Sequence, residues 1–260
     1  MNLDPVQASA ADQFGRQSHR YGKGHILADV SDVVSALEQI GPLPPPVRVL
    51  DVATGAGHTG LHLAGLGHDV TCADIAQPML DRVTESARER NVSIRTHLHP
   101  AEAFPYDDDE TFDLVTCRVA AHHFSDPAKF VSETARVLKP GGHFLLIDGS
   151  VEDDQSEAEE WTHQVEKLRD PSHHRFLRPS SWQSHCAAAG LKTIHCQLDP
   201  FKMPDLNWYF ETADTPPENR RRVLELVRTA PEQARRQFRI AEENGIIVWW
   251  WRRLTLIAQK

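Results

Sequence analysis

The feature that most constrains the fold is a regular alternation of strand-like and helix-like segments between residues 47 and 149. Short apolar runs typical of strands occur at 47–50, 70–73, 92–98, 112–117 and 143–147. Between them lie segments whose apolar residues are three and four positions apart, as on one face of a helix. One starts at about residue 59, and the others span 76–90 and 127–138. Strands that alternate with helices form parallel sheets whose two faces the helices cover. The sequence therefore predicts an α/β fold.

The regular pattern stops after Asp148 and resumes only in part. A helix with Ser180 or Ser181 as its cap and a strand over 191–198 are expected between two irregular stretches. The chain ends with Ile246–Ile257, which starts Ile-Ile-Val-Trp-Trp-Trp and predicts a last strand, antiparallel and interior or near the edge.

These segments predict one domain over residues 1–260. Its expected parts are an N-terminal segment at 1–45 with a helix over 25–40, a core at 46–149, and helical cap insertions at 150–179 and 200–244.

Charge and hydropathy exclude two classes of partner. Lys and Arg number 28 against 37 Asp and Glu, so the net charge of 28 − 37 = −9 is the wrong sign for a protein that coats nucleic acid. The longest apolar run, Ile246–Trp251, is far too short to cross a bilayer. Residues 1–20 lack the positively charged region followed by an apolar run that marks a secretory signal, so we expect a cytoplasmic protein. Neither a membrane nor a nucleic acid is expected as its partner.

A glycine-containing loop and an acidic residue follow the first two predicted strands. The loop is Asp51-Val-Ala-Thr-Gly-Ala-Gly-His58, and Asp74 stands nineteen residues beyond Gly55. Ligands bind at the carboxyl ends of parallel strands, where glycine allows close backbone approach and a carboxylate can accept both hydroxyls of a ribose. The pair predicts an adenosine-containing ligand.

Two ligands of that kind have to be distinguished. Residues 55–60 match the pattern GxGxxG of nicotinamide dinucleotide sites. Asp51, however, places negative charge where a pyrophosphate needs positive potential. A ligand with a cationic group is therefore favoured, and a nicotinamide-dependent oxidoreductase stays as an alternative.

Three segments together resemble the class I S-adenosylmethionine (SAM) dependent methyltransferases: Val49–Gly57, Thr111–Cys117 and Arg136–Gly142. Within that superfamily, Cys117–Pro127 is similar to the branch of ubiquinone and menaquinone biosynthesis enzymes, and Phe14–Tyr21 resembles its lid segment. The resemblance implies a Rossmann-like seven-stranded sheet, mostly parallel with an antiparallel last strand, and transfer of a methyl group from SAM to a small molecule with S-adenosylhomocysteine as product.

The resemblance also implies roles for individual residues. The cofactor-binding set it implies is Asp51, Ala53, Thr54, Gly55, Gly57, Asp74, Ile75, Ala101, Glu102, Cys117 and Arg118. The sequence departs from the family pattern at Ala53, a mild change as long as its φ is negative. It also departs at Pro100, which leaves the adenine amino group to backbone carbonyls or to Glu102.

Four of the fifteen histidines are candidates for contact with the acceptor: His122 and His123 after the fourth strand, and His173 and His174 in the first insertion. We expect His122, His123 or His173 to act as a general base, with His122, His174, Phe14 and Tyr21 as substrate-binding residues. Adjacent residues point apart, so at most one of His122 and His123 is expected to face the methyl group.

The remaining histidines are not expected to bind a metal or to act in catalysis. His58 and His62 lie four residues apart but have no evident third ligand, and methyl transfer from a sulfonium needs no metal. His97 and His99 are expected at the surface.

Two alternatives to a small-molecule methyltransferase stay open beside the oxidoreductase. One is a protein of this fold that binds SAM without transferring methyl. Another is an RNA methyltransferase that uses the seven arginines at 216–240, which the net charge of −9 disfavours. The sequence names neither the acceptor nor the oligomeric state, and a homodimer is compatible with it.

Overall fold

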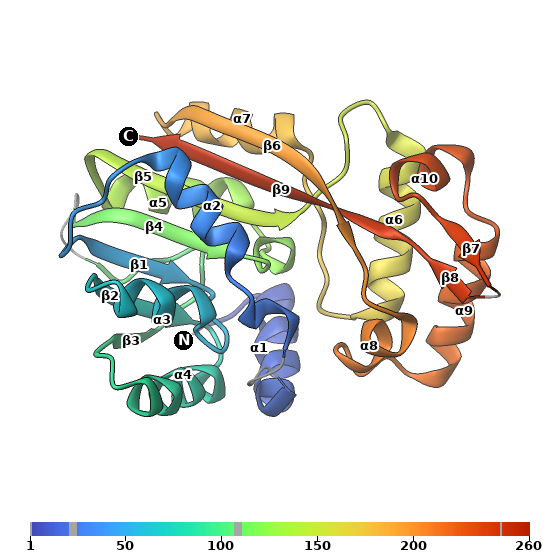
Figure 1. The fold of residues 1–260 in the computed structure, drawn as a ribbon, viewed down its shortest axis with the longest axis horizontal. Helices are drawn as coiled ribbons and strands as arrows, with labels where there is room; N and C mark the ends of the chain where they lie inside the picture. The colour runs from blue at the N-terminus through green and yellow to red at the C-terminus, as the bar shows by residue number, and fades with distance from the viewer. Residues whose placement is uncertain (1, 21–24, 107–110, 245) are drawn as a thin grey trace.

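The computed structural model describes residues 2–20, 25–106, 111–244 and 246–260. Its centre is a seven-stranded sheet in the order β3-β2-β1-β4-β5-β9-β6 (Figure 1). The strands are β1 (Arg48–Val52), β2 (Asp69–Asp74), β3 (Arg95–Leu98), β4 (Phe112–Arg118), β5 (Leu138–Gly149), β6 (Lys192–Lys202) and β9 (Trp250–Gln259). β1 to β5 pair in parallel, and β9 runs antiparallel between β5 and β6. The predicted sheet with its antiparallel last strand is confirmed.

Helices cover both faces of this sheet because successive strand residues point to opposite sides. Leu50 joins the hydrophobic cluster under α5 (Pro127–Val137) and α7 (Pro179–Ala188). Its neighbour Val49 joins the cluster on the other face. That second cluster includes residues of α2 (Ser31–Ile40), α3 (His58–Gly65) and α4 (Gln77–Arg90). Both faces are thus closed to water, and the open positions lie at the strand ends.

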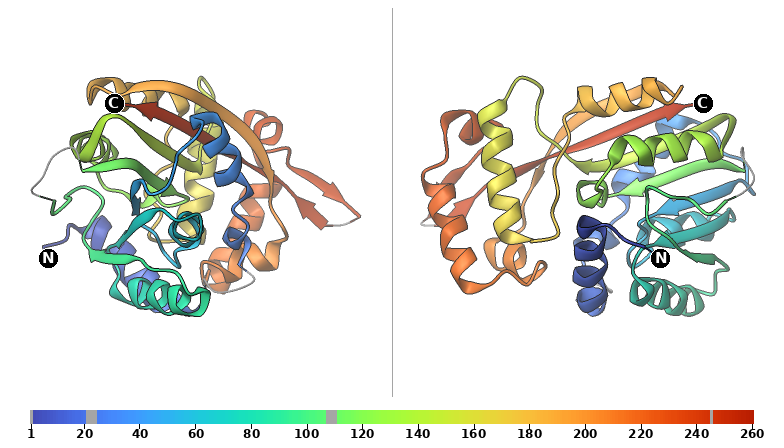
Figure 2. Two further views of the ribbon diagram at one scale, coloured as in Figure 1. Left: turned by 60° about the vertical axis from the view of Figure 1, so that its left-hand side comes forward. Right: turned by 180° about the vertical axis from the view of Figure 1, so that it is seen from behind.

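A second body lies beside the sheet and has its own apolar centre (Figures 1 and 2). Its elements are α6 (Ser156–Arg169), α8 (Leu206–Glu211), α9 (Pro217–Arg228), α10 (Glu232–Gln237) and the hairpin of β7 (Ala241–Glu243) and β8 (Ile246–Val248). Trp161, Tyr209, Phe238 and Trp249 are buried in this cluster. The long strands β6 and β9 connect the two bodies.

The last strand was predicted as one element, and the structure divides it at Trp249. β8 pairs with β7 in the second body, whereas β9 pairs with β5 and β6 in the sheet. The Trp249 ring is 1 % exposed and lies 4.9 Å from the Tyr209 ring, so the break places this side chain in the second core.

The N-terminal segment contributes α1 (Pro5–Gln17) and the short 3₁₀ turns η1 (Ser18–Arg20) and η2 (Ile26–Ala28). Asp4 caps α1 by accepting hydrogen bonds from the amides of Val6 and Gln7. In Figure 1 and in the right view of Figure 2, α1 lies between the two bodies.

The predicted helix over 25–40 is wrong in its first part, because α2 begins only at Ser31. The Arg118 guanidinium takes the carbonyls of Leu27 (2.8 Å) and Asp29 (2.6 Å), which a continuous helix would need for its own ladder. The Ser31 amide bonds to the Asp29 side chain instead.

Two smaller observations complete the fold. α7 begins at Pro179 with Arg178 as its N-cap, so the predicted serine cap is wrong. None of the helices in the described part of the chain has the length and the apolar character that a membrane crossing requires.

Candidate active site

Two large pockets adjoin at the carboxyl ends of β1, β2 and β4. Including the space that is open to solvent, the first spans about 890 Å³ and the second about 860 Å³. Phe14, Leu27, Val119 and His123 line both of them. Ligands of open α/β sheets bind at this end of the strands, and the shared wall lets two ligands approach each other.

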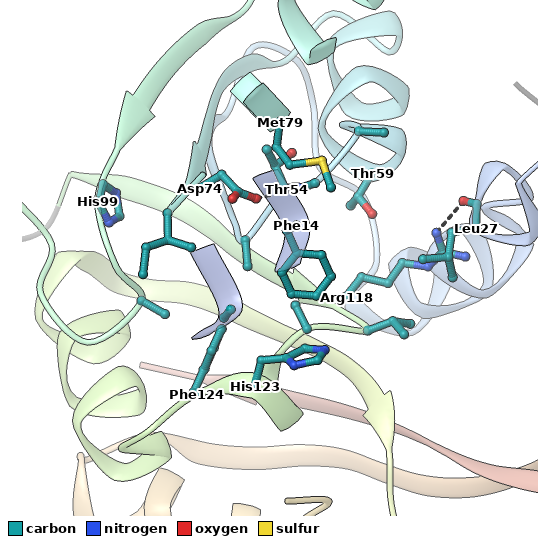
Figure 3. Close-up of a pocket in the computed structure, with 18 of the residues that line it drawn as sticks. Phe14, Leu27, Thr54, Thr59, Asp74, Met79, His99, Arg118, His123 and Phe124 are labelled. Atoms are coloured by element: carbon teal, nitrogen blue, oxygen red, sulfur yellow. Dashed lines mark hydrogen bonds between the residues drawn. The ribbon is translucent and has the colours of Figure 1, made fainter. Parts of the chain in front are cut away.

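Most of the predicted cofactor-binding residues line the first pocket. They come from the β1–α3 loop, the end of β2, the segment after β3 and the end of β4: Ala53, Thr54, Gly55, Asp74, Ile75, Ala101, Glu102 and Arg118. Figure 3 shows the Asp74 carboxylate and the Phe14 ring among the labelled residues of this pocket.

Asp74 and Gly55 fit an adenosine group. Asp74 accepts hydrogen bonds from the amides of Ala76 and Gly55, both at 2.9 Å, and its carboxylate keeps further acceptor capacity. Burial raises the pKa of Asp74 to about 6. Gly55 has a φ of +54°, and no heavy atom lies within 4 Å of the position that a Cβ would take. A ligand can therefore approach the backbone there closely, beside a buried acceptor for hydroxyl groups.

Asp51, predicted to bind the cofactor, does not line either pocket. Its carboxylate accepts from the hydroxyls of Thr54 and Thr116, both at 2.6 Å, and from the Gly60 amide at 3.1 Å. Burial raises the pKa of Asp51. These three donors make Asp51 a residue that fixes the β1–α3 loop from behind.

Gly57 and Cys117 also lie outside the lining of either pocket. Gly57 has a φ of +82°, and a Cβ there would lie 2.0 Å from Cγ2 of Val83, so this glycine allows α3 and α4 to pack. Cys117 is part of the sheet core. Their contribution to the site is structural.

Ala53 adopts a φ of +51°. The departure from the family pattern at this position was expected to be mild only if φ were negative, so that expectation is not met. A left-handed backbone costs a residue with a Cβ about 1 kcal/mol or more. The loop therefore carries strain at this position, next to Gly55 in the first pocket.

His99 is buried in the wall of the first pocket, so its predicted surface position is wrong. Its Nδ1 donates to the Pro100 carbonyl at 2.8 Å, and Nε2 lies 3.3 Å from the Tyr106 hydroxyl. Burial lowers the pKa of His99 to about 4. A neutral ring at this place adds an apolar surface beside Ala101.

Glu102 connects the first pocket to α1. One carboxylate oxygen accepts from the Ser125 amide at 2.9 Å, and the other accepts from the Gln7 side chain at 2.9 Å. The side chain is 8 % exposed. Both oxygens are thus engaged by the protein, and α1 is held over the pocket.

The second pocket combines aromatic and charged walls from both bodies. Beyond the four shared residues, it is lined by His25, Ile26, His122, Gly149, Glu166, Arg169, Asp170, Phe176, Phe201, Trp208, Thr212, Ala213, Trp251, Arg252 and Arg253. Many of these side chains are aromatic, which suits a flat and largely apolar ligand.

His122 forms a close pair with Asp148 at the wall of the second pocket. It lies in the 3₁₀ turn η3 (Ala121–His123) after β4, and Asp148 lies in β5. The ring Nδ1 donates to Asp148 Oδ1 at 2.7 Å, and the His122 amide donates to Oδ2 at 2.8 Å. Burial opposes a charged ring, but the Asp148 carboxylate outweighs it and raises the pKa of His122. Nε2 is left as the ring nitrogen that a ligand can reach.

His123 faces both pockets, so the expectation that the two adjacent side chains point apart is wrong. In a 3₁₀ turn successive side chains are about 120° apart, and the two ring centroids are 4.1 Å apart. His123 Nδ1 lies 3.1 Å from the Ser172 hydroxyl, which donates to Asp170 at 2.6 Å. Burial and the neighbouring His122 lower the pKa of His123.

The other predicted acceptor contacts have different positions. His173 is 1 % exposed and lies behind His122, with ring centroids 5.4 Å apart, and it lines neither pocket. His174 also lines neither pocket. Tyr21 lies outside the described residues. Among the residues that the structure describes, no three His, Cys, Asp or Glu side chains are arranged as metal ligands.

The two pockets are also connected through arginines. Arg118 in the first pocket donates from Nε to Asp32 Oδ2 at 3.1 Å, and Arg253 in the second pocket donates to the same oxygen at 3.0 Å (Figure 3 shows Arg118 bonded to Leu27). Asp32, near the start of α2, therefore accepts hydrogen bonds from two guanidinium groups.

Several lining residues were not predicted from the sequence. Gln7, Ala10, Leu27, Met79, Val119 and Phe124 line the first pocket, and Trp251, Arg252 and Arg253 line the second. Val119 and Phe124 lie in the Cys117–Pro127 segment, where the resemblance gave them no role, and the others come from α1, η2, α4 and β9 and belong to no motif. Only the position of their elements against the sheet reveals them.

Comparison with known proteins agrees with the geometry. The methyltransferase domain family matches residues 50–146. The uncharacterized methyltransferase YcgJ of Bacillus subtilis is 35% identical over 235 residues, which cover 89% of this chain and 91% of YcgJ. The ubiquinone biosynthesis O-methyltransferase of Aromatoleum aromaticum is 27% identical over 207 residues, 74% of this chain and 85% of that protein.

Solved structures show the same fold over most of the chain. The crystal structure of YcgJ superposes with a TM-score of 0.79 and 31% identity, covering 88% of this chain and 98% of YcgJ. A Bacillus halodurans C-125 protein described as a methyltransferase gives a TM-score of 0.81 and 30% identity, covering 88% of this chain and 99% of that protein. With its glycine loop, Asp74 and seven-stranded sheet, the chain belongs to the class I SAM-dependent methyltransferases.

Proposed function

We propose that the protein binds SAM in the first pocket and methylates a small molecule in the second pocket, with His122 as general base. The observation that carries this proposal is the junction of the two pockets. Phe14 and His123 line both, and the His122–Asp148 pair lies at the wall of the second. A donor and an acceptor would thus meet beside a ring whose proton affinity is raised.

The first pocket supports the cofactor assignment through its chemistry. Asp74 would accept the ribose hydroxyls, and Gly55 would allow the ligand to approach the loop. Ile75 and Ala101 would pack against the adenine, with the neutral His99 beside them. Because Glu102 is engaged by Ser125 and Gln7, the adenine amino group is left to backbone carbonyls.

SAM supplies a methyl group on a positively charged sulfur. The protein's own contribution is to align the acceptor, exclude water and hold a proton at His122. A hydroxyl or an acidic C–H of the acceptor gives its proton to His122 Nε2 while its oxygen or carbon bonds to the methyl carbon. SAM, when bound, would supply the methyl group and leave as the neutral thioether S-adenosylhomocysteine, with the carbon–sulfur electron pair on sulfur. Asp148 stabilises the resulting imidazolium, and a base of this kind contributes about 10²–10⁴-fold.

The remaining parts of the chain would enclose the reactants. We assign residues 1–45 as a lid, because Gln7, Ala10 and Phe14 line the first pocket. Residues 46–149 would form the cofactor-binding core. Residues 150–179 and 200–244 would form the cap, because Glu166 and Trp208 line the second pocket.

The test of this function is calorimetric titration with S-adenosylhomocysteine and, separately, with NAD. We expect S-adenosylhomocysteine to bind and Asp74→Ala to weaken it about 10- to 100-fold, because hydrogen bonds to a charged group contribute about 1.5–3 kcal/mol. Asp81→Ala is the matched control, since Asp81 is an exposed carboxylate on α4. NAD binding tighter than S-adenosylhomocysteine would overturn the assignment.

A further inference from the structure

We propose that the acceptor is a planar, largely aromatic molecule that carries a carboxylate, and that Arg253 binds this carboxylate. The inference rests on the proposed function of the second pocket and names its substrate class. It is carried by the aromatic walls and by an arginine with unused donors among them.

Aromatic side chains in contact with one another make up much of the wall of the second pocket. The rings of Phe201 and Trp251 are stacked, with centroids 6.2 Å apart and planes 6° apart. Trp208 lies 5.9 Å from Trp251 in a T-shaped arrangement, and Phe176 lies 5.1 Å from the His122 ring. All of them line the second pocket. Such rings favour a planar apolar body over a flexible polar one.

Arg253 presents a cation beside these rings. Its guanidinium carbon lies 3.7 Å from the centroid of Phe201, which extends the stack of Phe201 and Trp251. Within the described part of the chain, Arg253 donates one hydrogen bond, from Nη1 to Asp32. A guanidinium carries five N–H donors in a planar fork that matches a carboxylate. Most of its donors are therefore available to a ligand.

Among the described residues, Arg253 shares its one direct carboxylate partner with a second arginine. Asp32 pairs with both Arg253 and Arg118, so two guanidinium groups share one carboxylate. Asp148 and Asp29 act on Arg253 from a greater distance, without a hydrogen bond to it. The side chains of Arg253 and Asp32 are only 19% and 14% exposed, so a carboxylate on the ligand would be the second direct anionic partner of Arg253.

The other charged side chains of the pocket have their own partners. Arg169 donates to Glu166, to the Tyr209 carbonyl and to Thr212. Arg252 is paired with Glu152 at 2.6 Å. Asp170 is held by the amide and the hydroxyl of Ser172. Arg169, Glu166 and Asp170 are thus engaged by the protein, whereas Arg252 keeps a buried Nε without a hydrogen-bond partner in the described part of the chain.

The position of Arg253 relative to His122 fits one small molecule. Arg253 pairs with Gly149 in the register of β5 and β9, and Asp148 precedes Gly149. Arg253 and His122 line the same pocket, and the Asp148 carboxylate that pairs with His122 also acts electrostatically on Arg253. An aromatic acid with a hydroxyl group would place its carboxylate at Arg253 and its nucleophile toward His122.

The experiment uses the full chain saturated with S-adenosylhomocysteine and three probes that differ in one substituent. The probes are 6-hydroxy-2-naphthoate, its neutral carboxamide and its cationic aminomethyl analogue, titrated by calorimetry and by ligand-observed NMR. We expect the naphthoate to bind about 10- to 100-fold tighter than the carboxamide. Arg253→Met keeps the packing on Phe201 and should remove this preference, whereas Arg253→Lys should keep part of it.

Arg239→Met is the matched control, because Arg239 also stacks on a ring, Trp250 at 5.2 Å, but is exposed outside the pocket. It should leave all three affinities unchanged. Equal binding of the three probes, absence of binding, or a preference that survives Arg253→Met would each overturn the proposal. Titration with S-adenosylhomocysteine in every variant reports folding and the cofactor site, so a failure of the proposed function appears there as a separate result.

Discussion

The two adjacent histidines of η3 have opposite proton affinities because their partners differ. His122 bonds directly to the Asp148 carboxylate, which raises its pKa against the effect of burial. His123 reaches Asp170 only through the Ser172 hydroxyl, and burial together with the charge of His122 lowers its pKa. One ring is thus suited to accept a proton, and its neighbour stays neutral in the wall between the pockets.

The raised pKa of His122 predicts a specific pH dependence of stability. A histidine whose folded-state pKa exceeds its usual value of 6.5 stabilises the fold fully below pH 6.5 and loses this contribution as pH rises through the folded-state pKa. The loss of free energy of unfolding caused by His122→Asn should therefore be largest below about pH 6.5 and should shrink above it. Urea denaturation of the wild type and of His122→Asn at a series of pH values measures this difference in the free energy of unfolding.

His143→Asn is the control with the opposite sign. Burial lowers the pKa of His143, so the wild type should lose stability relative to this variant as pH falls below 6.5. Parallel pH curves for the two variants would contradict the assignment. In NMR titrations, Asp148→Asn should also lower the pKa of His122.

Some residues of the site could be predicted from the sequence and others could not. Gly55 and Asp74 were predicted because a short local motif places them at strand ends, and both line the first pocket. Asp51 belongs to the same motif but turns away, since Thr116 on the neighbouring strand β4 supplies a buried donor. His99 was misplaced because its burial depends on Tyr106 and on helices that no local pattern shows.

The helices and strands themselves follow the sequence pattern where their contacts are local. α4 and α5 have their predicted spans because Pro and the capping Asp126 start α5 and apolar spacing continues each helix. The segment at 25–30 does not follow its sequence pattern, because its contacts are not local. Its apolar spacing is helical, but Arg118, about 90 residues away in sequence, takes the carbonyls and leaves only a 3₁₀ turn.

α1 is held to the second body by two glutamine side chains, and this contact predicts its mobility. Gln13 and Gln17 both donate from Nε2 to the Ala213 carbonyl, at 3.1 and 3.2 Å, and both are buried. Replacing both by alanine should speed hydrogen exchange of the α1 amides about tenfold, because each bond contributes about 0.5–1.5 kcal/mol. Exchange followed by mass spectrometry, peptide by peptide, measures the effect.

The amides of β4 serve as the internal reference and should exchange at the wild-type rate in that variant. Gln183→Ala, an exposed glutamine on α7, is the matched substitution and should leave α1 unchanged. If α1 exchanges equally in the double variant and the wild type, the glutamines do not hold it. Equal acceleration in β4 would instead indicate global destabilisation.

The two bodies differ in how far the sequence predicts them. The sheet with its flanking helices follows from alternating segments at 47–149, since each βα unit contacts its neighbours in sequence. The second body is built by contacts of α6 with α8, α9 and α10, which lie about 40 to 70 residues further along the chain. Hydrophobic patterns could indicate helices there, but not the pocket that these elements form with the sheet.

Glu166 joins three distant parts of the chain and predicts how the second body is held to β9. One carboxylate oxygen accepts from the Tyr209 hydroxyl and from Trp251 Nε1, both at 3.0 Å, and the other pairs with Arg169 at 3.3 Å. Glu166→Leu would remove the acceptor of the buried Tyr209 hydroxyl and of the half-buried Trp251 N–H, and also the carboxylate that pairs with Arg169. We expect the free energy of unfolding to fall by about 3–5 kcal/mol.

Chemical denaturation followed by tryptophan fluorescence measures this loss, and Glu160→Leu on the exposed side of the same helix provides the control. The control should change the free energy of unfolding by no more than about 0.5 kcal/mol. Glu166→Gln should fall between the two, because its carbonyl oxygen can still accept from Tyr209 and Trp251 while the charge opposite Arg169 is lost. If Glu166→Leu matches Glu160→Leu, hydrophobic packing alone holds the second body to β9. If instead Glu166→Gln is as damaging as leucine, the ion pair with Arg169 outweighs the two neutral hydrogen bonds.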